Sequence, residues 1–323
     1  FCTLLKRKRN FMLLPLTLLP TTKVFSFGTS VVVVNDGASQ IVSATCVEDR
    51  RRWGHVLCLS QRLEDRNRRF AVVSLGGGDF MSVTLYEGDA EKPLTTSDIP
   101  GQKCKTCIIS PCGTYVAVWY TAEEVNMVLV LQVKKSKNAE FTLRQISDEP
   151  SSFPFFCGDL FTVVSDSELQ MWSLPDELTA SVPIPGEVVC TSGSTSCFGA
   201  IAVEGGYAYV LSCESSTRRA TLTPLILSPP PPNESEFIDC CCSSETVAFT
   251  TGGSTFLGNF KGLESSRTVF QSQLKGSVIA LVPTSSNIYA KIGGISTELL
   301  PMVEPSNSAL LSDVKTTFLP PVL

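Results

Sequence analysis

The stretch VAFTTGGSTFLGNF, residues 247–260, contains the feature that decides the fold. Two short runs of β-branched, aromatic and other apolar residues flank the pair Gly252 and Gly253, a pattern that predicts a β-hairpin with a tight turn. An isolated hairpin is only marginally stable in water, because it has nothing against which to bury its apolar face. We therefore expect this hairpin to pack against further strands of the same chain.

The same hairpin pattern recurs along the whole sequence. SVVVVNDGASQIVSATC and FGAIAVEGGYAYVLS are two further examples. The turns lie about forty residues apart, a period typical of repeat architectures, and are centred near Gly37, Gly77, Glu123, Asp166, Gly205, Gly252 and Gly293. Apolar runs such as EVVCTS and EFIDCCC precede most hairpins, and runs such as ATLTPLIL follow them, so each unit supplies four strands. This organisation predicts an all-β fold, a seven-bladed β-propeller of four-stranded antiparallel blades.

The repeats also predict the domain boundaries. We expect residues 22–318 to form a single propeller, residues 1–21 an N-terminal tail that is either disordered or an extra strand, and residues 319–323 a C-terminal tail. Since ring closure removes exposed sheet edges, either the N-terminal segment or residues 305–323 should supply the last outer strand.

The N-terminal sequence KRKR, followed by FMLLPLTLLP, has three interpretations. It is a signal peptide, a basic cluster for nuclear import or phosphate contact, or a tail without a specific role. No apolar run approaches the length of about eighteen residues that a transmembrane helix needs, so we predict no membrane span.

Three fragments resemble WD40 repeats: ISPCGTYVAVW (109–119), WGHVLCLS (53–60) and VVSDSELQMWSL (163–174). The resemblance covers roughly residues 22–318 and implies a propeller that acts as a non-catalytic scaffold in a large assembly, of which ribosome-biogenesis, trafficking and cilium-associated complexes are examples. The chain departs from the family pattern because it contains no Trp-Asp dipeptide and a single histidine, His55. The double glycines after several second strands also resemble kelch repeats, which imply the same overall fold.

The composition offers little catalytic chemistry. Catalysis through a Ser-His-Asp or Cys-His arrangement would have to use His55, which the WD40 resemblance already explains structurally. The sequence has no phosphate-binding loop, no nucleophile elbow and no HxxxH zinc motif. We therefore predict a protein that is not an enzyme and that has no cofactor and no small-molecule substrate. A propeller glycan hydrolase stays an alternative, because such enzymes place carboxylates around the axis.

Thirteen cysteines make metal binding and disulfides the next question. Their odd number in a long chain favours reduced, buried thiols, and thus a nuclear or cytoplasmic location. Cys104, Cys107 and Cys112 are the closest approach to a zinc or redox site, but no second CxxC or ligand histidine follows at zinc-finger spacing, so we predict that they bind no metal. The triplet Cys240, Cys241 and Cys242 should alternate its side chains across a strand.

Charge is concentrated in one segment between the first two repeats. The net charge of −5 excludes a surface that is basic all over, so any contact with nucleic acid must be local. Arginine is the side chain that binds phosphates and carboxylates bidentately, and this segment holds Arg50, Arg51, Arg52, Arg62, Arg66, Arg68 and Arg69. These arginines either form salt bridges within solvated loops or make a contact surface near one rim, for RNA, an anionic ligand or an acidic part of a partner protein.

These observations predict a function by binding. The leading hypothesis is a WD40-like scaffold subunit that binds other protein subunits in a large, nuclear and RNA-associated assembly. The alternatives are direct RNA or anionic-ligand binding through the arginine-rich loops, and a propeller enzyme.

Overall fold

The computed structural model describes residues 16–302, apart from short gaps. The gaps are residues 43–46, 66, 90, 135–139, 149–152, 166, 175–176, 195–196, 215–218, 232–235, 244, 252, 261–262, 264–266, 273, 275 and 285–287. No helix among the described residues is both long and apolar enough to cross a membrane.

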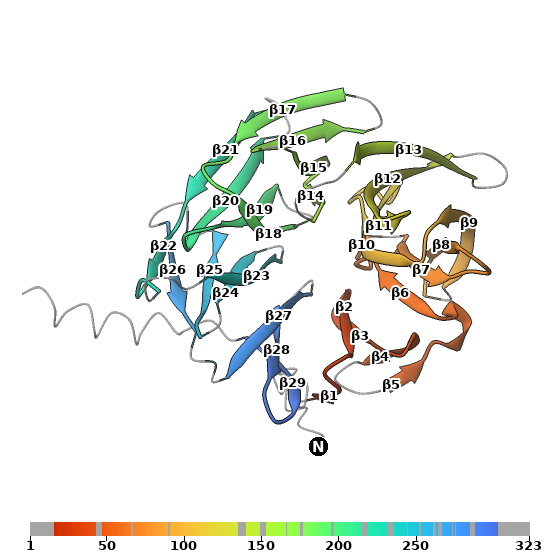
Figure 1. Cartoon of the computed structure of the whole chain (residues 1–323), viewed down its shortest axis with the longest axis horizontal. Coiled ribbons are helices and arrows are strands. Elements are labelled where there is room, and N and C mark those ends of the chain that lie inside the picture. The colour runs from red at the N-terminus through yellow and green to blue at the C-terminus, as the bar shows by residue number, and fades with distance from the viewer. Residues whose placement is uncertain are drawn as a thin grey trace, which may run out of the picture.

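Seven small antiparallel sheets are arranged as the blades of a ring (Figure 1). Blade one consists of β2 (Lys23–Phe27), β3 (Ser30–Asn35), β4 (Ala38–Val42) and β5 (Val47–Asp49), followed by the 3-10 turn η1 (Arg51–Trp53). Blade two consists of β6 (Val56–Leu59), β7 (Phe70–Leu75), β8 (Phe80–Glu87) and β9 (Lys92–Pro100). Blade three consists of β10 (Lys103–Ile109), β11 (Tyr115–Ala122), β12 (Val125–Lys134) and β13 (Glu140–Asp148).

The next two blades repeat this order. Blade four consists of β14 (Phe155–Cys157), β15 (Leu160–Ser165), β16 (Glu168–Ser173) and β17 (Glu177–Pro183). Blade five consists of β18 (Val188–Gly193), β19 (Phe198–Val203), β20 (Tyr207–Glu214) and β21 (Arg219–Pro224). In both, as in the first three, the first strand lies nearest the axis and the fourth at the outside (Figure 1).

Blades six and seven each take a strand from elsewhere in the chain. Blade six consists of β23 (Phe237–Cys242), β24 (Thr246–Thr251), β25 (Thr255–Asn259) and β26 (Thr268–Gln271), and β22 (Ile226–Ser228) pairs parallel to β26 at its outer edge. Blade seven consists of β27 (Ser277–Pro283), β28 (Ile288–Gly293) and β29 (Thr297–Pro301), with β1 (Leu16–Leu18) as its fourth strand. The N-terminal segment therefore closes the ring, one of the two closures that the sequence predicts.

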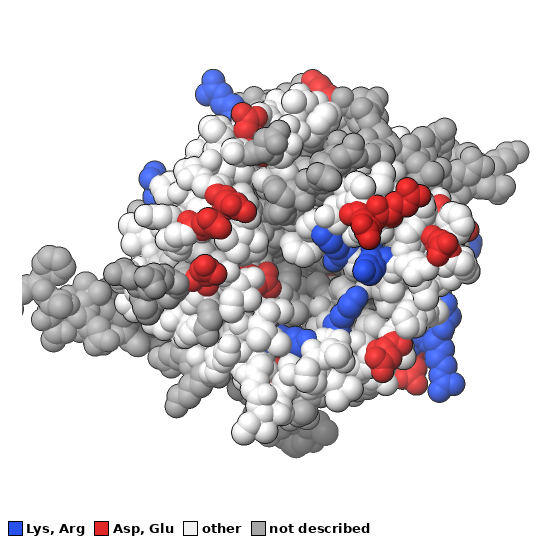
Figure 2. Space-filling model, viewed as in Figure 1, with Lys and Arg blue, Asp and Glu red and all other residues white. Residues whose placement is uncertain are grey.

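The direction of the strands gives the propeller two different rims. In every blade, the turn between the second and third strands lies at the same end as the connection to the next blade. We call this end the connection rim; the turn after Asn35 and the connection at η1 both lie on it. The other end, the opposite rim, carries the turns between first and second strands and between third and fourth strands. Figure 2 shows a face of the ring that is hollowed at its centre.

The core is divided among the seven contacts between neighbouring blades. A separate cluster of buried apolar residues fills each contact, from blades one and two round to blades seven and one. The second strand of each blade serves two clusters, because its side chains alternate between the two faces of the sheet. In β3, Val32 and Val34 pack toward blade two, whereas Val31 and Val33 pack toward blade seven.

The predicted hairpins correspond to the second and third strands of the blades. The turn in blade one has the left-handed φ angles of a tight hairpin, +47° at Asp36 and +78° at Gly37. Asp166 and Gly252 lie outside the described residues, but the strands that flank them pair as hairpins. The cysteine triplet alternates as expected, since Cys240 and Cys242 face blade five and Cys241 faces blade seven. The run ATLTPLIL was predicted as one outer strand, but it divides between β21 in blade five and β22, whose pairing with blade six was not predicted.

Substitution of two adjacent leucines, Leu18 at the end of β1 and Leu19 directly after it, tests whether β1 closes the ring. Leu18 is 7% exposed and packs in the cluster between blades seven and one, whereas Leu19 is 59% exposed. We expect Leu18→Ala to lower the free energy of unfolding by about 2–4 kcal/mol through lost burial and a cavity. The matched control Leu19→Ala should change it by less than about 0.5 kcal/mol. Equal losses in chemical denaturation would contradict closure through β1.

Candidate functional site

The arginines predicted as a contact surface come from the two segments that flank β6. Arg50, Arg51 and Arg52 lie in the connection between blades one and two, and Arg62, Arg68 and Arg69 lie in the loop between β6 and β7. These segments lie at opposite ends of β6, but the side chains of Arg50, Arg62 and Arg68 line one shared pocket. The expected contact surface near one rim stays a prediction. Arg66 lies outside the described residues. We call the six described arginines and their acidic partners the arginine seam.

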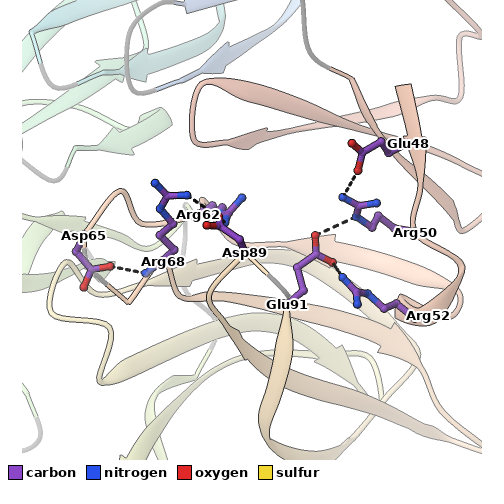
Figure 3. Close-up of polar contacts among 8 residues, drawn as sticks. All are labelled: Glu48, Arg50, Arg52, Arg62, Asp65, Arg68, Asp89 and Glu91. Carbon is purple, nitrogen blue, oxygen red and sulfur yellow. Dashed lines mark hydrogen bonds and ion pairs between the residues drawn. The ribbon is translucent and has the colours of Figure 1, made fainter. Parts of the chain in front are cut away.

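A buried glutamate organises the first half of the seam. Arg50 reaches Glu48 (Nη2 to Oε2, 2.6 Å) and Glu91 (Nε to Oε1, 3.0 Å), and Arg52 reaches the other oxygen of Glu91 at 2.5 Å (Figure 3). The side chain of Glu91 is only 2% exposed. A buried carboxylate is costly unless it is paired, so these two guanidinium groups compensate for its burial. They fix the connection from blade one onto blade two.

An exposed aspartate organises the second half. Asp89 accepts hydrogen bonds from Arg62 at 2.6 Å and from Arg68 at 2.5 Å (Figure 3). The hydrogen bond from Arg68, followed by that from Arg62, lowers the pKa of the Asp89 carboxyl. The guanidinium of Arg62 also lies 5.1 Å from the centre of the Phe27 ring in blade one, a cation–π contact. The loop of blade two is thereby held against blade one.

Arg69 extends the seam to blade three. Its Nη1 donates to the backbone carbonyl of Gly113 at 3.1 Å, and its Nη2 lies 3.2 Å from Glu87 Oε1. Both partners lie away from the arginine-rich segment in sequence. The side chain is 18% exposed, so it is mostly covered by these contacts.

The acidic partners that the sequence analysis missed come from the turn between β8 and β9. Glu87, Asp89 and Glu91 all lie in the segment YEGDAEK, whose repeated carboxylates are the signal that could have identified them. Together with the acidic residues next to the arginines in sequence, Glu87, Asp89 and Glu91 balance the positive charge of the seam. Only Arg51 is almost fully exposed, at 93%, with Asp49 at 4.0 Å.

The candidate metal ligands do not converge. Cys104 and Cys107 are buried on β10, where burial raises the pKa of both thiols, and Cys112 is exposed in the turn that follows. Cys112 Sγ contacts Thr114 Oγ1 at 2.7 Å rather than another thiol. Within the described residues, no group of three histidine, cysteine, aspartate or glutamate side chains is placed to hold a metal ion.

His55 lies in an exposed position on the connection rim. Its ring covers the turn of blade one so closely that a Cβ atom on Gly37 would lie 2.2 Å from Nδ1. The neighbouring Trp53 is buried, and its indole nitrogen has no hydrogen-bond partner. The buried Asp-His-Ser/Thr-Trp network of WD40 blades is therefore not formed around His55.

One cavity lies on the propeller axis. Its volume is about 560 Å³, and the innermost strands of all seven blades line it. Lys23, Lys105, Lys291 and Asp239 are the charged residues of its lining. Figure 2 shows lysine and arginine side chains gathered beside the central hollow, over β2 and β10.

Two charged groups of this cavity are held by backbone atoms. Asp239 on β23 accepts the backbone N–H of Leu281 at 2.7 Å and that of Cys240 at 2.9 Å, which links blades six and seven. Burial raises its pKa to about 6, although these hydrogen bonds lower it. Lys291 is 9% exposed and donates to the carbonyl of Thr22 at 2.5 Å. Desolvation lowers the pKa of Lys291.

Comparison with solved structures identifies the fold of this chain. No protein-family model and no curated protein matches the sequence. The structure is similar to the β-propeller domain of Myceliophteria thermophila Cps50 (Swd1), with a TM-score of 0.60 and 11% identity over 90% of this chain and 100% of that chain. It is also similar to the RRP9 WD40 repeats, with a TM-score of 0.54 and 12% identity over 90% of this chain and 97% of that chain. The chain has the WD40 propeller fold.

A third WD40-type neighbour is Kluyveromyces lactis Hsv2, with a TM-score of 0.55 and 8% identity over 84% of this chain and 90% of that chain. These comparisons confirm the predicted WD40-like propeller. The kelch resemblance stays a prediction.

The raised pKa of Asp239 predicts a pH dependence of stability in this WD40 propeller. Because the folded state binds the proton more tightly than the unfolded state, the free energy of unfolding falls as pH rises from about 4 to 7. Over this pH range the free energy of unfolding of the wild-type protein should fall by about 2 kcal/mol more than that of the Asp239→Asn variant. The reason is that each unit of pKa shift corresponds to about 1.4 kcal/mol. Parallel curves in urea denaturation at several pH values would contradict a raised pKa.

Proposed function

We propose that this protein is a non-catalytic scaffold that binds partner proteins through its connection rim. The observation that carries the proposal is the position of the exposed apolar side chains. Large apolar residues are normally covered when they cluster, so their exposure on one rim favours a protein interface there. Among the described residues, most of the exposed large apolar side chains lie on this rim, either at the turns between second and third strands or near the start of first strands. They are Leu75, Phe80, Val125, Val189, Tyr207, Ile238, Ile279 and Ile295.

The chemistry of the described residues supports binding rather than catalysis. The single histidine does not line the axial cavity, and that lining contains one carboxylate, Asp239. A glycan hydrolase needs a pair of carboxylates that flank the scissile bond. Apart from Asp239 and the lysines, the cavity lining consists of apolar residues and of uncharged polar residues such as Thr106, Thr191 and Ser192.

The finer proposal places the scaffold in a nuclear, RNA-associated assembly, such as one of ribosome biogenesis. It is supported by the basic KRKR sequence near the N-terminus and by the likeness to the RRP9 WD40 repeats. A cytoplasmic location is the alternative.

A rim-specific co-purification tests the scaffold function. We expect Phe80→Ser, Tyr207→Ser and Ile295→Ser in combination to remove most associated proteins from the affinity-purified chain, because they remove exposed apolar anchors. The control Leu178→Ser changes a 48% exposed leucine at the start of β17, on the opposite rim. Loss of the same proteins from both variants, or from neither, would contradict binding through the connection rim.

RNA or anionic-ligand binding through the arginine-rich loops is the second candidate, and its residues are Arg50, Arg51, Arg52, Arg62, Arg66, Arg68 and Arg69. The exposed guanidinium of Arg51 is the observation that favours it. The ion pairs made by the other described arginines favour a structural role instead.

Charge-reversal variants distinguish a structural role of the arginines from a role in binding. We expect Arg62→Glu, Arg68→Glu and Arg69→Glu together to lower the melting temperature and to leave partner association intact, because they break the pairs with Asp89 and Glu87. A contact surface would behave in the opposite way, with association lost at constant melting temperature. If the contact is RNA, its affinity should also fall steeply with salt, with a logarithmic slope of about −0.7 for each phosphate contact on a single strand.

A further inference from the structure

Sulfur atoms gather where blade four contacts blade five, at the end nearest the opposite rim. Cys157 ends β14, the innermost strand of blade four, and Cys213 lies near the end of β20, the third strand of blade five. Cα atoms of these two strands come within 8 Å of each other. Both side chains belong to the apolar cluster between the two blades, and they are only 1% and 4% exposed. Two cysteines from different blades therefore share one buried site.

The two thiols are in direct contact. The thiol of Cys157 donates a hydrogen bond to the sulfur of Cys213, and Cys213 Sγ in turn lies 3.6 Å from Met171 Sδ. The hydrogen bond from Cys157 lowers the pKa of the Cys213 thiol, because it stabilises the thiolate, although burial raises it. The same hydrogen bond, followed by burial, raises the pKa of Cys157. Cys213 is therefore the member of the pair that more readily becomes a thiolate, which is the nucleophilic form of cysteine.

A third cysteine lies between this pair and the surface. Cys197 belongs to the turn between β18 and β19, on the opposite rim, and is half-buried. Its backbone carbonyl accepts the N–H of Cys213 at 2.9 Å, and its Sγ would lie 3.1 Å from a Cβ atom on Gly158, the residue after Cys157. The buried pair is therefore directly beneath the rim, where a molecule little larger than water needs only a small local opening to reach Cys213.

Two other pairs of thiols join neighbouring blades. Cys58 is hydrogen-bonded to Cys104 between blades two and three, and Cys190 to Cys240 between blades five and six. All four side chains are buried. Burial, followed by the hydrogen bond within each pair, raises the pKa of the Cys104 and Cys240 thiols. These pairs are internal controls, because they share the contact between thiols, whereas burial keeps Cys104 and Cys240 in the protonated form.

We propose that hydrogen peroxide converts Cys157 and Cys213 into a disulfide that locks blade four to blade five. The thiolate of Cys213 attacks one peroxide oxygen, the O–O bond breaks and hydroxide leaves, so that Cys213 becomes a sulfenic acid. The sulfur of Cys157 then attacks the sulfur of Cys213; the S–S bond forms, the S–O bond breaks, and the oxygen leaves as water with the Cys157 proton. The proton that Cys213 lost neutralises the hydroxide. Two thiols are thus oxidised by two electrons, and peroxide is reduced to two water molecules.

The disulfide acts as a reversible lock within the ring. In the reduced protein, apolar packing holds the contact between blades four and five. A covalent bond between strands of different blades constrains the unfolded chain and thereby stabilises the folded one. A thiol reductant such as dithiothreitol breaks the bond by exchange and restores the reduced pair. The lock acts on stability and does not depend on the proposed scaffold function.

Mass spectrometry of the full chain tests the disulfide. The reduced protein is exposed to hydrogen peroxide, then unfolded, alkylated and digested. We expect two peptides joined through Cys157 and Cys213, which dithiothreitol separates. The pairs at Cys58 and Cys190 should be oxidised at least about tenfold more slowly, because burial disfavours their thiolates. The melting temperature of the oxidised protein should rise by about 3–6 °C.

Two variants separate the disulfide from general oxidation. Cys157→Ala removes the thiol that attacks the sulfenic acid, so peroxide should leave Cys213 as a sulfenic acid that dimedone labels, and the melting temperature should not rise. The matched control Cys190→Ala removes a buried thiol at another contact between blades, and it should keep both the disulfide and the rise in melting temperature. If Cys157→Ala does not fold, the peptide map of the unaltered chain still decides.

Three results of the peptide map would overturn the proposal. The first is that Cys157 and Cys213 stay reduced after the exposed Cys112 is fully oxidised. The second is a disulfide in which Cys197 takes the place of either cysteine, and the third is oxidation of all three pairs at equal rates. A disulfide between Cys157 and Cys213 that leaves the melting temperature unchanged would also contradict a lock between the blades.

Discussion

Burial of the second strand on both faces is the constraint on which the rest of the structure depends. A strand such as β3, with four consecutive buried valines, cannot be stable at the surface of a sheet, because one of its two faces would remain in water. Each blade must therefore have a neighbour on either side, and only a closed ring gives all seven blades two neighbours. Closure by β1 follows from the same requirement, since it places Leu18 over the contact between the last blade and the first.

This constraint explains why the fold could be predicted from so divergent a sequence. The hairpin period and the apolar second strands are properties of local sequence, and they remain although His55 is exposed and no Trp-Asp dipeptide is present. Apolar packing holds the blades together without the polar network of WD40 blades, since Phe70, Phe161 and Phe249 are fully buried in their inter-blade clusters. That β22 joins blade six could not be predicted, because its parallel partner β26 lies beyond the prolines at 229–232 and three further strands.

The candidate sites were less predictable, because they depend on residues distant in sequence. The arginine segment is conspicuous in the sequence, but its counter-charges Glu87 and Asp89 come from the far end of blade two, and Gly113 comes from blade three. By contrast, the lysines of the axial cavity are scattered singly and become neighbours only when the ring closes. Bulges are likewise invisible in a single sequence, although the bulge at Lys105 places that lysine in the lining of the axial cavity. The two regions therefore differ in character: most arginines of the seam are ion-paired within the fold, whereas Lys23 and Lys105 of the axial cavity are exposed.

Native-state hydrogen exchange of the second strands tests the central claim most directly. If both-face burial in a closed ring holds the structure together, the central amides of β3, β7, β11, β15, β19, β24 and β28 should exchange only through global unfolding, with equal free energies of opening in all seven blades. Substitution of Leu18 by alanine should then lower all seven values together. Second strands that open at widely different free energies, or a response to Leu18→Ala confined to blades seven and one, would contradict the account.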